Sequence, residues 1–138
     1  MVHCLIERID EFEKIFFDKS KVTFQNETQK GDELVIKNNR TITLNSGTAE
    51  GKILGGNLTV LTALSGTPYL PDFKDAILFL EDIGEYLYNV DRMLYQLKRA
   101  GKLKKLSGLI FGGFTDMKDT DRPFGKTVYE VIQEIIAA

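Results

Sequence analysis

Apolar residues recur along this 138-residue chain with two different spacings, one typical of helices and one of strands. Near the start they fall every three or four positions between charged residues, which predicts an amphipathic helix over residues 2–16. The same spacing predicts a helix over residues 89–100, with Asn89 as its cap. A last helix is predicted to begin at Thr127, where Glu130 three residues later completes a capping box.

Strand-like patterns occupy the middle of the chain. Residues 33–36 and 40–44 are rich in β-forming side chains and flank a turn-like pair of asparagines, which indicates a hairpin. Residues 76–80 form a continuous apolar run that is too short for a helix and typical of a strand covered on both faces. A further strand is predicted over residues 108–111.

A segment rich in glycine, residues 46–56, separates the predicted hairpin from the apolar strand. Its composition predicts a bend, or a close approach of its backbone to another group. Asn57 is then a candidate cap for a short helix that buries Leu58 and Leu61 and stops near Gly66. The whole pattern predicts one mixed α/β domain with strands in the middle and helices at both ends.

Composition excludes several kinds of chemistry. Lys and Arg number 18 and Asp and Glu 20, so the formal net charge is −2 and offers no basic surface for nucleic acid or an anionic membrane. Cys4 and His3 are the one cysteine and the one histidine, too few for a disulfide framework or a Cys/His zinc site in one copy. This count excludes most metal chemistry. Neither a signal peptide nor an apolar run of about 20 residues is present, which predicts a cytoplasmic protein.

Two short motifs have ordinary structural explanations. The sequence Gly125-Lys126-Thr127 is similar to the end of a phosphate-binding loop, but Thr120 stands where that motif requires glycine. A capped helix start explains these residues. His3 and Cys4 are adjacent, and neighbours in a helix point about 100° apart, so we do not expect a Cys-His catalytic pair.

An acidic cluster follows the apolar strand and is the strongest candidate for chemistry. It comprises Glu81, Asp82 and Glu85. Ligands of α/β folds collect at the carboxyl ends of strands, where a carboxylate can orient a histidine, act as a general base or bind a cationic group. A solvated strand end, to which Asp82 would belong, is the alternative. A glycosidase-like pair of Glu81 and Glu85 is a further one, although nothing marks a sugar platform.

Five separated blocks make a family resemblance specific. In order they are Gly55-Gly56-Asn57-Leu58, Gly66-Thr67-Pro68-Tyr69, Leu78-Phe79-Leu80-Glu81-Asp82 with Glu85, Asp91-Arg92-Met93-Leu94, and residues 108–114. Together they resemble the C-terminal domain of the LD-carboxypeptidases, serine peptidases that include the microcin-immunity hydrolases. The resemblance implies an α/β domain of the swivelling β/β/α type, normally packed on a separate N-terminal domain with the active site between the two.

The resemblance also implies roles for individual residues. Glu81 corresponds to the triad glutamate, which accepts the N–H of a histidine and stabilises the imidazolium as a serine attacks. Asn57, Glu85, Gly112 and Gly113 are candidates for the wall of the substrate pocket. The serine of the N-terminal domain and the histidine, on a strand after the last helix, are expected outside residues 1–138.

The implied activity is hydrolysis of the L-to-D peptide bond of a murein tetrapeptide, which releases the terminal D-alanine during cell-wall recycling. Expected partners are the murein peptide, the missing N-terminal domain and a second copy of the chain. One alternative is a hydrolase of aminoacyl-nucleotides of the microcin-immunity type, which would differ in its pocket walls and in the loop 118–125. The other is a docking module without catalytic activity.

Overall fold

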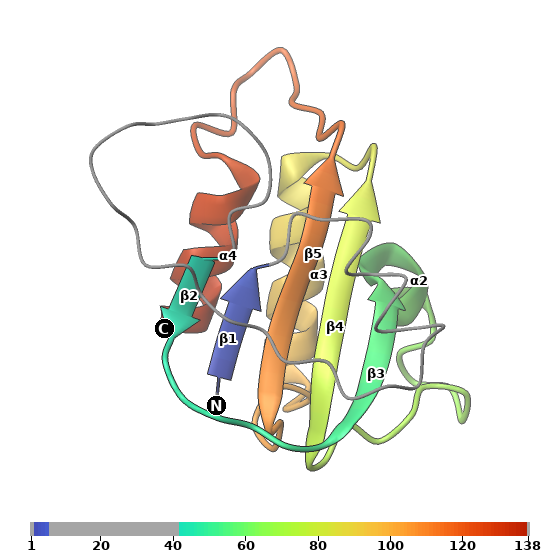
Figure 1. Ribbon diagram of the computed structural model, residues 1–138. Coiled ribbons are helices and arrows are strands. Elements are labelled where there is room, and N and C mark those ends of the chain that lie inside the picture. Colours follow the sequence, from blue (N-terminus) through green and yellow to red (C-terminus); the bar gives the residue numbers. More distant parts are fainter. Residues whose placement is uncertain (1, 6–41, 138) are drawn as a thin grey trace, which may run out of the picture.

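Two apolar runs lie side by side at the centre of a five-stranded sheet. The computed structural model describes residues 2–5 and 42–137, and all statements on structure concern these residues. The strand order is β2-β1-β5-β4-β3, in which β2 is antiparallel to β1 and the other strands are parallel (Figure 1). The strands are β1 (Val2–Leu5), β2 (Ile42–Asn45), β3 (Lys52–Asn57), β4 (Ala76–Ile83) and β5 (Gly108–Thr115).

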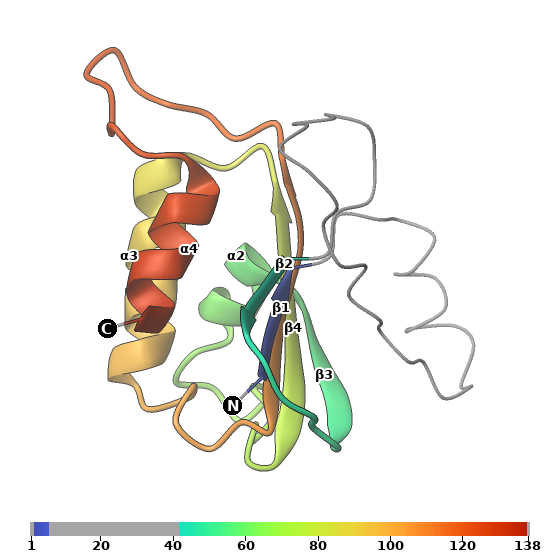
Figure 2. The same ribbon diagram turned by 60° about the vertical axis from the view of Figure 1, so that its left-hand side comes forward.

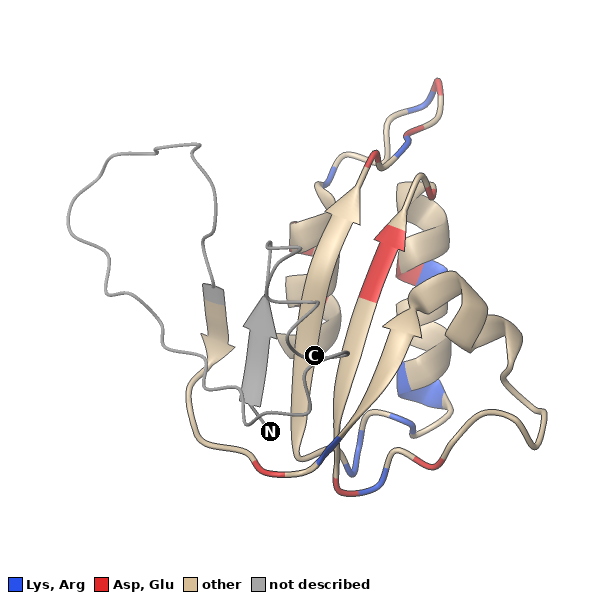
Figure 3. Ribbon diagram, turned by 45° about the vertical axis from the view of Figure 1, so that its right-hand side comes forward, with Lys and Arg blue, Asp and Glu red and all other residues tan. Residues whose placement is uncertain are grey.

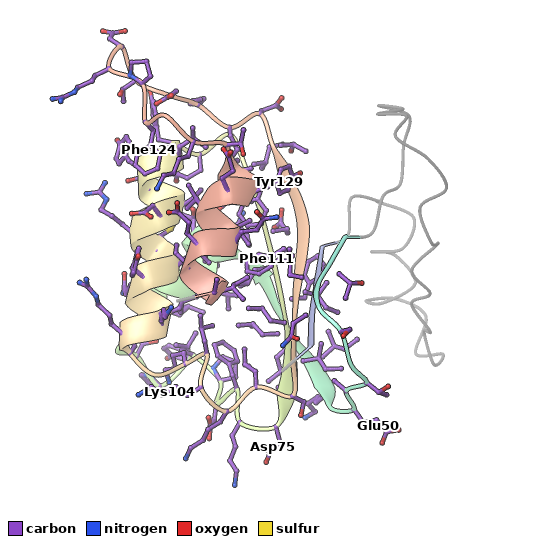
Figure 4. The ribbon with its side chains drawn as sticks, turned by 90° about the vertical axis from the view of Figure 1, so that its left-hand side faces the viewer. Glu50, Asp75, Lys104, Phe111, Phe124 and Tyr129 are labelled. Atoms are coloured by element: carbon purple, nitrogen blue, oxygen red, sulfur yellow. The ribbon has the colours of Figure 1, made fainter. Side chains whose placement is uncertain are left out.

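The described helices cover one face of this sheet (Figure 2). They are α2 (Leu58–Ala63), α3 (Leu87–Arg99) and α4 (Val128–Ala137). Alternate residues of β4 and β5 point into the core that the helices close, and Phe111 points from β5 toward α4 (Figure 4). The fully buried members of this core include Leu58, Leu78, Leu80, Val90, Leu94, Leu97, Leu109, Phe111, Val131, Ile132 and Ile135. No helix among the described residues is long and apolar enough to cross a membrane.

The predicted elements of the second half are confirmed, with changes at their ends. The capping box at Thr127 forms, because its hydroxyl accepts from the Glu130 N–H while the Glu130 carboxylate accepts from the Thr127 N–H. Asn57 caps α2 by accepting from the Val60 N–H at 3.0 Å. Helix α3 begins earlier than predicted, with Tyr86 as its cap, so the assignment of Asn89 as the cap is wrong. The Asn89 side chain instead donates to Glu85, which lies one turn before it.

The predicted opening helix is wrong where the structure tests it. Val2–Leu5 is a strand that pairs in parallel with β5 and antiparallel with β2. Its four residues are too few for helical spacing to be distinguished from a strand, and the open edge of β5 satisfies their backbone groups. The rest of that helix lies outside the described residues, as does the first half of the predicted hairpin. Strand β2 confirms part of the second half, and its observed partner is β1.

The predicted bend accounts for only the first part of residues 46–56, because strand β3 begins at Lys52. Gly55 sits at a φ of +142°, and a Cβ there would lie 1.8 Å from the Phe79 carbonyl oxygen. Only glycine allows β3 to approach β4 in this way. Strand β4 also runs further than predicted, through Glu81 and Asp82 to Ile83.

Candidate active site at the carboxyl end of β4

The acidic residues of β4 lie at the end where the parallel strands finish (Figure 3). Successive side chains of a strand point to opposite faces, so Glu81 and Asp82 diverge. Asp82 points to the face that carries the helices, where it contacts α2. Glu81 shares the other face with Phe79, which lies outside the core beneath the helices. Glu81 and Asp82, which are adjacent in the sequence, therefore lie on opposite faces of the sheet.

Asp82 is almost completely buried, with 3% of its surface exposed, and its carboxylate is saturated with donors. One oxygen accepts from Asn57 Nδ2 at 2.9 Å and from the Ile83 N–H at 2.8 Å. The other accepts from the N–H and the hydroxyl of Thr59 at 3.0 and 2.8 Å. Such a group ties the end of β4 to the end of β3 and the first turn of α2. The alternative of a solvated strand end therefore does not hold for Asp82, and Thr59 was not singled out from the sequence.

A β-bulge in β5 lies directly opposite Glu81. Leu80 pairs with Phe111 and Asp82 with Phe114, so Gly112 and Gly113 together face Glu81. A Cβ at Gly112 would lie 2.6 Å from Phe79 Cζ and 3.3 Å from Glu81 Cβ, so the missing side chain makes room for both residues. A Cβ at Gly113 would meet only Thr115, at 3.6 Å. Gly112 therefore shapes the surroundings of Glu81 directly, whereas Gly113 supplies the extra residue of the bulge.

The environment of Glu81 raises the pKa of its carboxyl group above the ordinary value. Partial burial is the largest cause, and the nearby negative charge of Asp82 is the second. The side chain of Asn57, its register partner on β3, opposes this shift. An added cationic donor, such as an imidazolium, would favour the ionised form. Glu81 is thus a partly buried carboxyl group that holds its proton more tightly than usual.

Glu85 lies at the same edge but in a more open environment. Hydrogen bonds from Asn89 Nδ2 and from the Tyr86 N–H, both 2.8 Å long, lower its pKa, and the Lys118 charge adds to this effect. Its second oxygen lies 3.3 Å from the Thr59 hydroxyl, which also bonds to Asp82. The structure therefore brings Asn57, Asp82 and Glu85 into one network through Thr59. A role for Glu85 at the substrate remains a prediction.

The histidine of this sequence stands far from Glu81. His3 pairs with Leu109 on β5, and Leu109 pairs with Leu78 on β4, three residues before Glu81. Three residues along a strand and two strands across the sheet separate the two Cα atoms by about 14 Å. That separation is longer than a histidine and a glutamate can bridge with a hydrogen bond. Within the described residues, no group of three His, Cys, Asp or Glu residues is arranged to hold a metal ion.

The chain forms a partly parallel α/β sheet with a partly buried carboxyl group at its carboxyl edge, the edge where ligands of α/β domains collect. The model of the LD-carboxypeptidase C-terminal domain matches residues 50–138. The chain therefore belongs to this family, as the five sequence blocks predicted. Its mixed α/β architecture is also that of the solved members.

Named relatives agree with this assignment. The probable murein peptide carboxypeptidase of Bacillus subtilis is 35% identical over 123 residues, which is 89% of this chain and 35% of that protein. The murein tetrapeptide carboxypeptidase of Pseudomonas aeruginosa is 41% identical over 68 residues, or 49% of this chain and 23% of that protein. The chain thus spans about a third or less of the length of these relatives.

Solved structures of carboxypeptidases and of MccF also resemble this chain. The muramoyltetrapeptide carboxypeptidase of Oxalobacter formigenes superposes with a TM-score of 0.57 and 41% identity, over 63% of this chain and 30% of that one. The microcin C7 self-immunity protein MccF, in complex with glutamyl sulfamoyl guanosine, superposes with a TM-score of 0.61 and 26% identity. That match covers 94% of this chain and 42% of MccF.

Proposed function

We propose that this chain supplies the triad glutamate, Glu81, to a serine carboxypeptidase that removes the terminal D-alanine of a murein tetrapeptide. The observation that carries the proposal is the position of Glu81. It lies at the carboxyl end of β4, on the face away from the helices, beside a glycine that leaves space next to it. The relatives named as murein peptide carboxypeptidases support the substrate class.

In this reaction Glu81 acts on a histidine and does not touch the peptide. Its carboxylate accepts one imidazole N–H, which fixes the tautomer so that the other nitrogen can take the proton of the attacking serine. The imidazolium that forms is stabilised by the negative charge, and the raised pKa of Glu81 falls as this pair develops. The serine and the histidine are proposed to come from outside residues 1–138, because His3 is too distant. An activated serine and an oxyanion hole suffice for acyl transfer, so the proposal includes no metal or cofactor.

Turnover by the complete protein tests the role of Glu81. Glu81→Gln is nearly isosteric, so β4 should still pack, but the neutral amide cannot stabilise an imidazolium. The equivalent amide substitution in the serine-protease triad lowers turnover about 10⁴-fold, and we expect a loss of roughly 10² to 10⁴ with little change in KM. Release of D-alanine from murein tetrapeptide measures it, and Glu134→Gln on the exposed side of α4 is the matched control. Normal turnover in Glu81→Gln, with a collapse in Glu85→Gln, would show that Glu85 is the carboxylate of the triad.

One observation favours hydrolysis of aminoacyl-nucleotides as a second candidate. The structural match to MccF covers 94% of this chain, more than the match to the Oxalobacter enzyme. The loop that follows β5 is suited to distinguishing substrates, since Lys118 pairs with Tyr86 beside the site and Asp119 organises the loop by accepting from Phe124. Parallel assays on murein tetrapeptide and on an aminoacyl sulfamoyl nucleoside decide between the two functions.

An N-terminal domain of the kind found in this family is proposed to cover the carboxyl edge of the sheet. Val60 and Ile83 expose 58% and 62% of their surfaces there, next to Asn57 and Asp82. Exposed apolar side chains at a site are typical of an interface between domains. The proposal places the protein in the cytoplasm, where murein peptides are recycled. A second copy of the chain could cover the same edge, and light scattering of the isolated chain distinguishes a monomer from such a dimer.

A further inference from the structure

Asn57 occupies a central place in the site because both ends of its amide group are engaged. Its Oδ1 accepts from the Val60 N–H at 3.0 Å, and its Nδ2 donates to Asp82 at 2.9 Å. The orientation of the amide is therefore determined by its partners. The nitrogen carries a second hydrogen, and the residue paired with Asn57 across the strands is Glu81.

Asp82 is the group that imposes this orientation. A buried carboxylate accepts hydrogen bonds and donates none, so the nitrogen of Asn57, and never its oxygen, must face Asp82. The carboxylate itself is held by Thr59, with one bond from the backbone and one from the side chain. The chain of hydrogen bonds thus runs from the first turn of α2 through Asp82 to Asn57, whose register partner on β4 is Glu81.

We propose that Asp82 is a positioning residue for Glu81, which it serves by holding the Asn57 amide with its nitrogen toward the Glu81 carboxylate. The proposal gives a role to the buried charge of Asp82, which the catalytic triad does not use. It deepens the proposed function, since a triad glutamate needs a fixed direction, and it rests on that function for its importance. The two adjacent acids then have different tasks: one faces the reaction, and the other holds the group beside it.

Nuclear magnetic resonance on the isolated chain tests the proposal without any turnover. In the wild-type chain, the side-chain amide signals of Asn57 should shift with pH and show the same midpoint as the carboxyl carbon of Glu81. If the Asn57 signals do not follow Glu81, the amide does not face that carboxylate and the proposal is overturned. This measurement needs no variant, so it decides even if a substitution of Asp82 prevents folding.

Asp82→Asn then separates positioning from mere packing. The new amide keeps one acceptor oxygen and replaces the other with a donor. The N–H and hydroxyl of Thr59 then compete with Asn57 for the remaining acceptor, so the Asn57 amide is no longer fixed. We expect the Asn57 signals to stop following Glu81, and the pKa of Glu81 to fall because a nearby like charge is removed. Glu134→Gln removes a carboxylate charge on the exposed side of α4, away from this network, and should change neither observation. A folded Asp82→Asn chain in which Asn57 still follows Glu81 would refute the role.

The positioning role of Asp82 and the proposed function can fail separately. If the amide signals follow Glu81 but Glu81→Gln leaves turnover of the complete protein intact, Asp82 still positions Glu81 and only the proposed function is rejected. If Glu81→Gln abolishes turnover but the Asn57 signals are independent of Glu81, the function stands and the positioning role is rejected.

Discussion

Glu81 and Asp82 are neighbours in the sequence and point to opposite faces of the sheet. Asp82 is buried under α2 with its donors in place, whereas Glu81 is only partly buried beside Gly112. Because the strand separates them, one can be a structural anchor while the other stays available to a partner. Predictions for the two residues therefore differ, although their chemistry is the same.

Ionisation of Glu81 should reduce the stability of the isolated chain. The folded state raises the pKa of this carboxyl group, so the folded chain binds the proton more tightly than the unfolded chain. The resulting stabilisation is complete below the unfolded pKa and is lost as the pH rises through the folded value. We expect Glu81→Gln to have a Tm equal to or above that of the wild type at neutral pH, with the difference disappearing in acid. Thermal unfolding at a series of pH values measures this.

Glu85 should behave in the opposite way and serves as the internal control. Its pKa is lowered by bonds from Asn89 and Tyr86, so its contribution to stability is present above the unfolded pKa and is lost as the pH falls through the folded value. Glu85→Gln should therefore be less stable than the wild type at neutral pH and equal to it in acid. If Glu81→Gln and Glu85→Gln change the stability in the same direction at neutral pH, the environments assigned to the two carboxyl groups are wrong.

Gly55 and Gly56 form a matched pair that separates steric clash from backbone strain. Both have φ near +142°, but a Cβ at Gly55 would strike the Phe79 carbonyl, whereas a Cβ at Gly56 meets nothing within 4 Å. Gly56→Ala should cost only the strain, about 1–3 kcal/mol. Gly55→Ala should cost more than about 4 kcal/mol or prevent folding. Urea unfolding measures the free energy of unfolding of both variants. Equal losses of that free energy would mean that β3 and β4 are not as close as described.

Gly112 and Gly113 give a second pair, which tests the bulge beside Glu81. Gly112→Ala would push its methyl group into the Phe79 ring and should lower the free energy of unfolding by about 1–3 kcal/mol. Gly113→Ala meets ordinary contact only, and its φ is not positive, so it should stay within about 0.5 kcal/mol of the wild type. In the complete protein, Gly112→Ala should also lower turnover, since Glu81 must move with Phe79. Tolerance of Gly112→Ala would show that the space beside Glu81 is not needed.

The isolated 138-residue chain should release no D-alanine from murein tetrapeptide. Its histidine lies about 14 Å from Glu81 by strand geometry, so no triad can form around that glutamate within one copy. The purified chain and its Glu81→Ala variant should be equally inactive by chromatography of the products. Activity of the chain above that variant would disprove the proposed division of the site.

Much of the fold could be predicted from the sequence where a local rule acts alone. The capping box of Thr127 and Glu130 is local, and so is the cap that Asn57 provides, and both were identified correctly. The apolar run of β4 could be identified because burial on both faces removes polar positions. Strand β3 was missed, because Gly55 and Gly56 weaken every strand signal and are required only by the approach of another strand. Strand β1 was missed for a related reason, since its partners come from distant parts of the chain.

The site could be predicted in its residue types but not in its geometry. The family resemblance identified Glu81, and the position at a strand end made it a reasonable candidate from physical grounds. The sequence could not show which acid of the pair is buried, because this depends on which face the helices cover. Thr59 gave no signal at all, since a threonine in the first turn of a helix is ordinary. A Ser, Thr or Asn after a glycine-rich strand could be examined for such a role in other chains.

The bulge at Gly112 and Gly113 also changes which sequence positions of β5 face the core. One additional residue in β5 inverts the parity of the strand, so that Phe111 and Phe114 both face the helices, with ring centroids 6.1 Å apart, although an odd number of positions separates them. Deleting either glycine would remove the bulge and leave Phe114 two positions after Phe111, so strict alternation would still point it inward, but Glu81 would then face one residue of β5 instead of two. The extra residue is therefore not what buries Phe114. Its effect falls on the surroundings of Glu81, where it places a glycine beside the carboxylate.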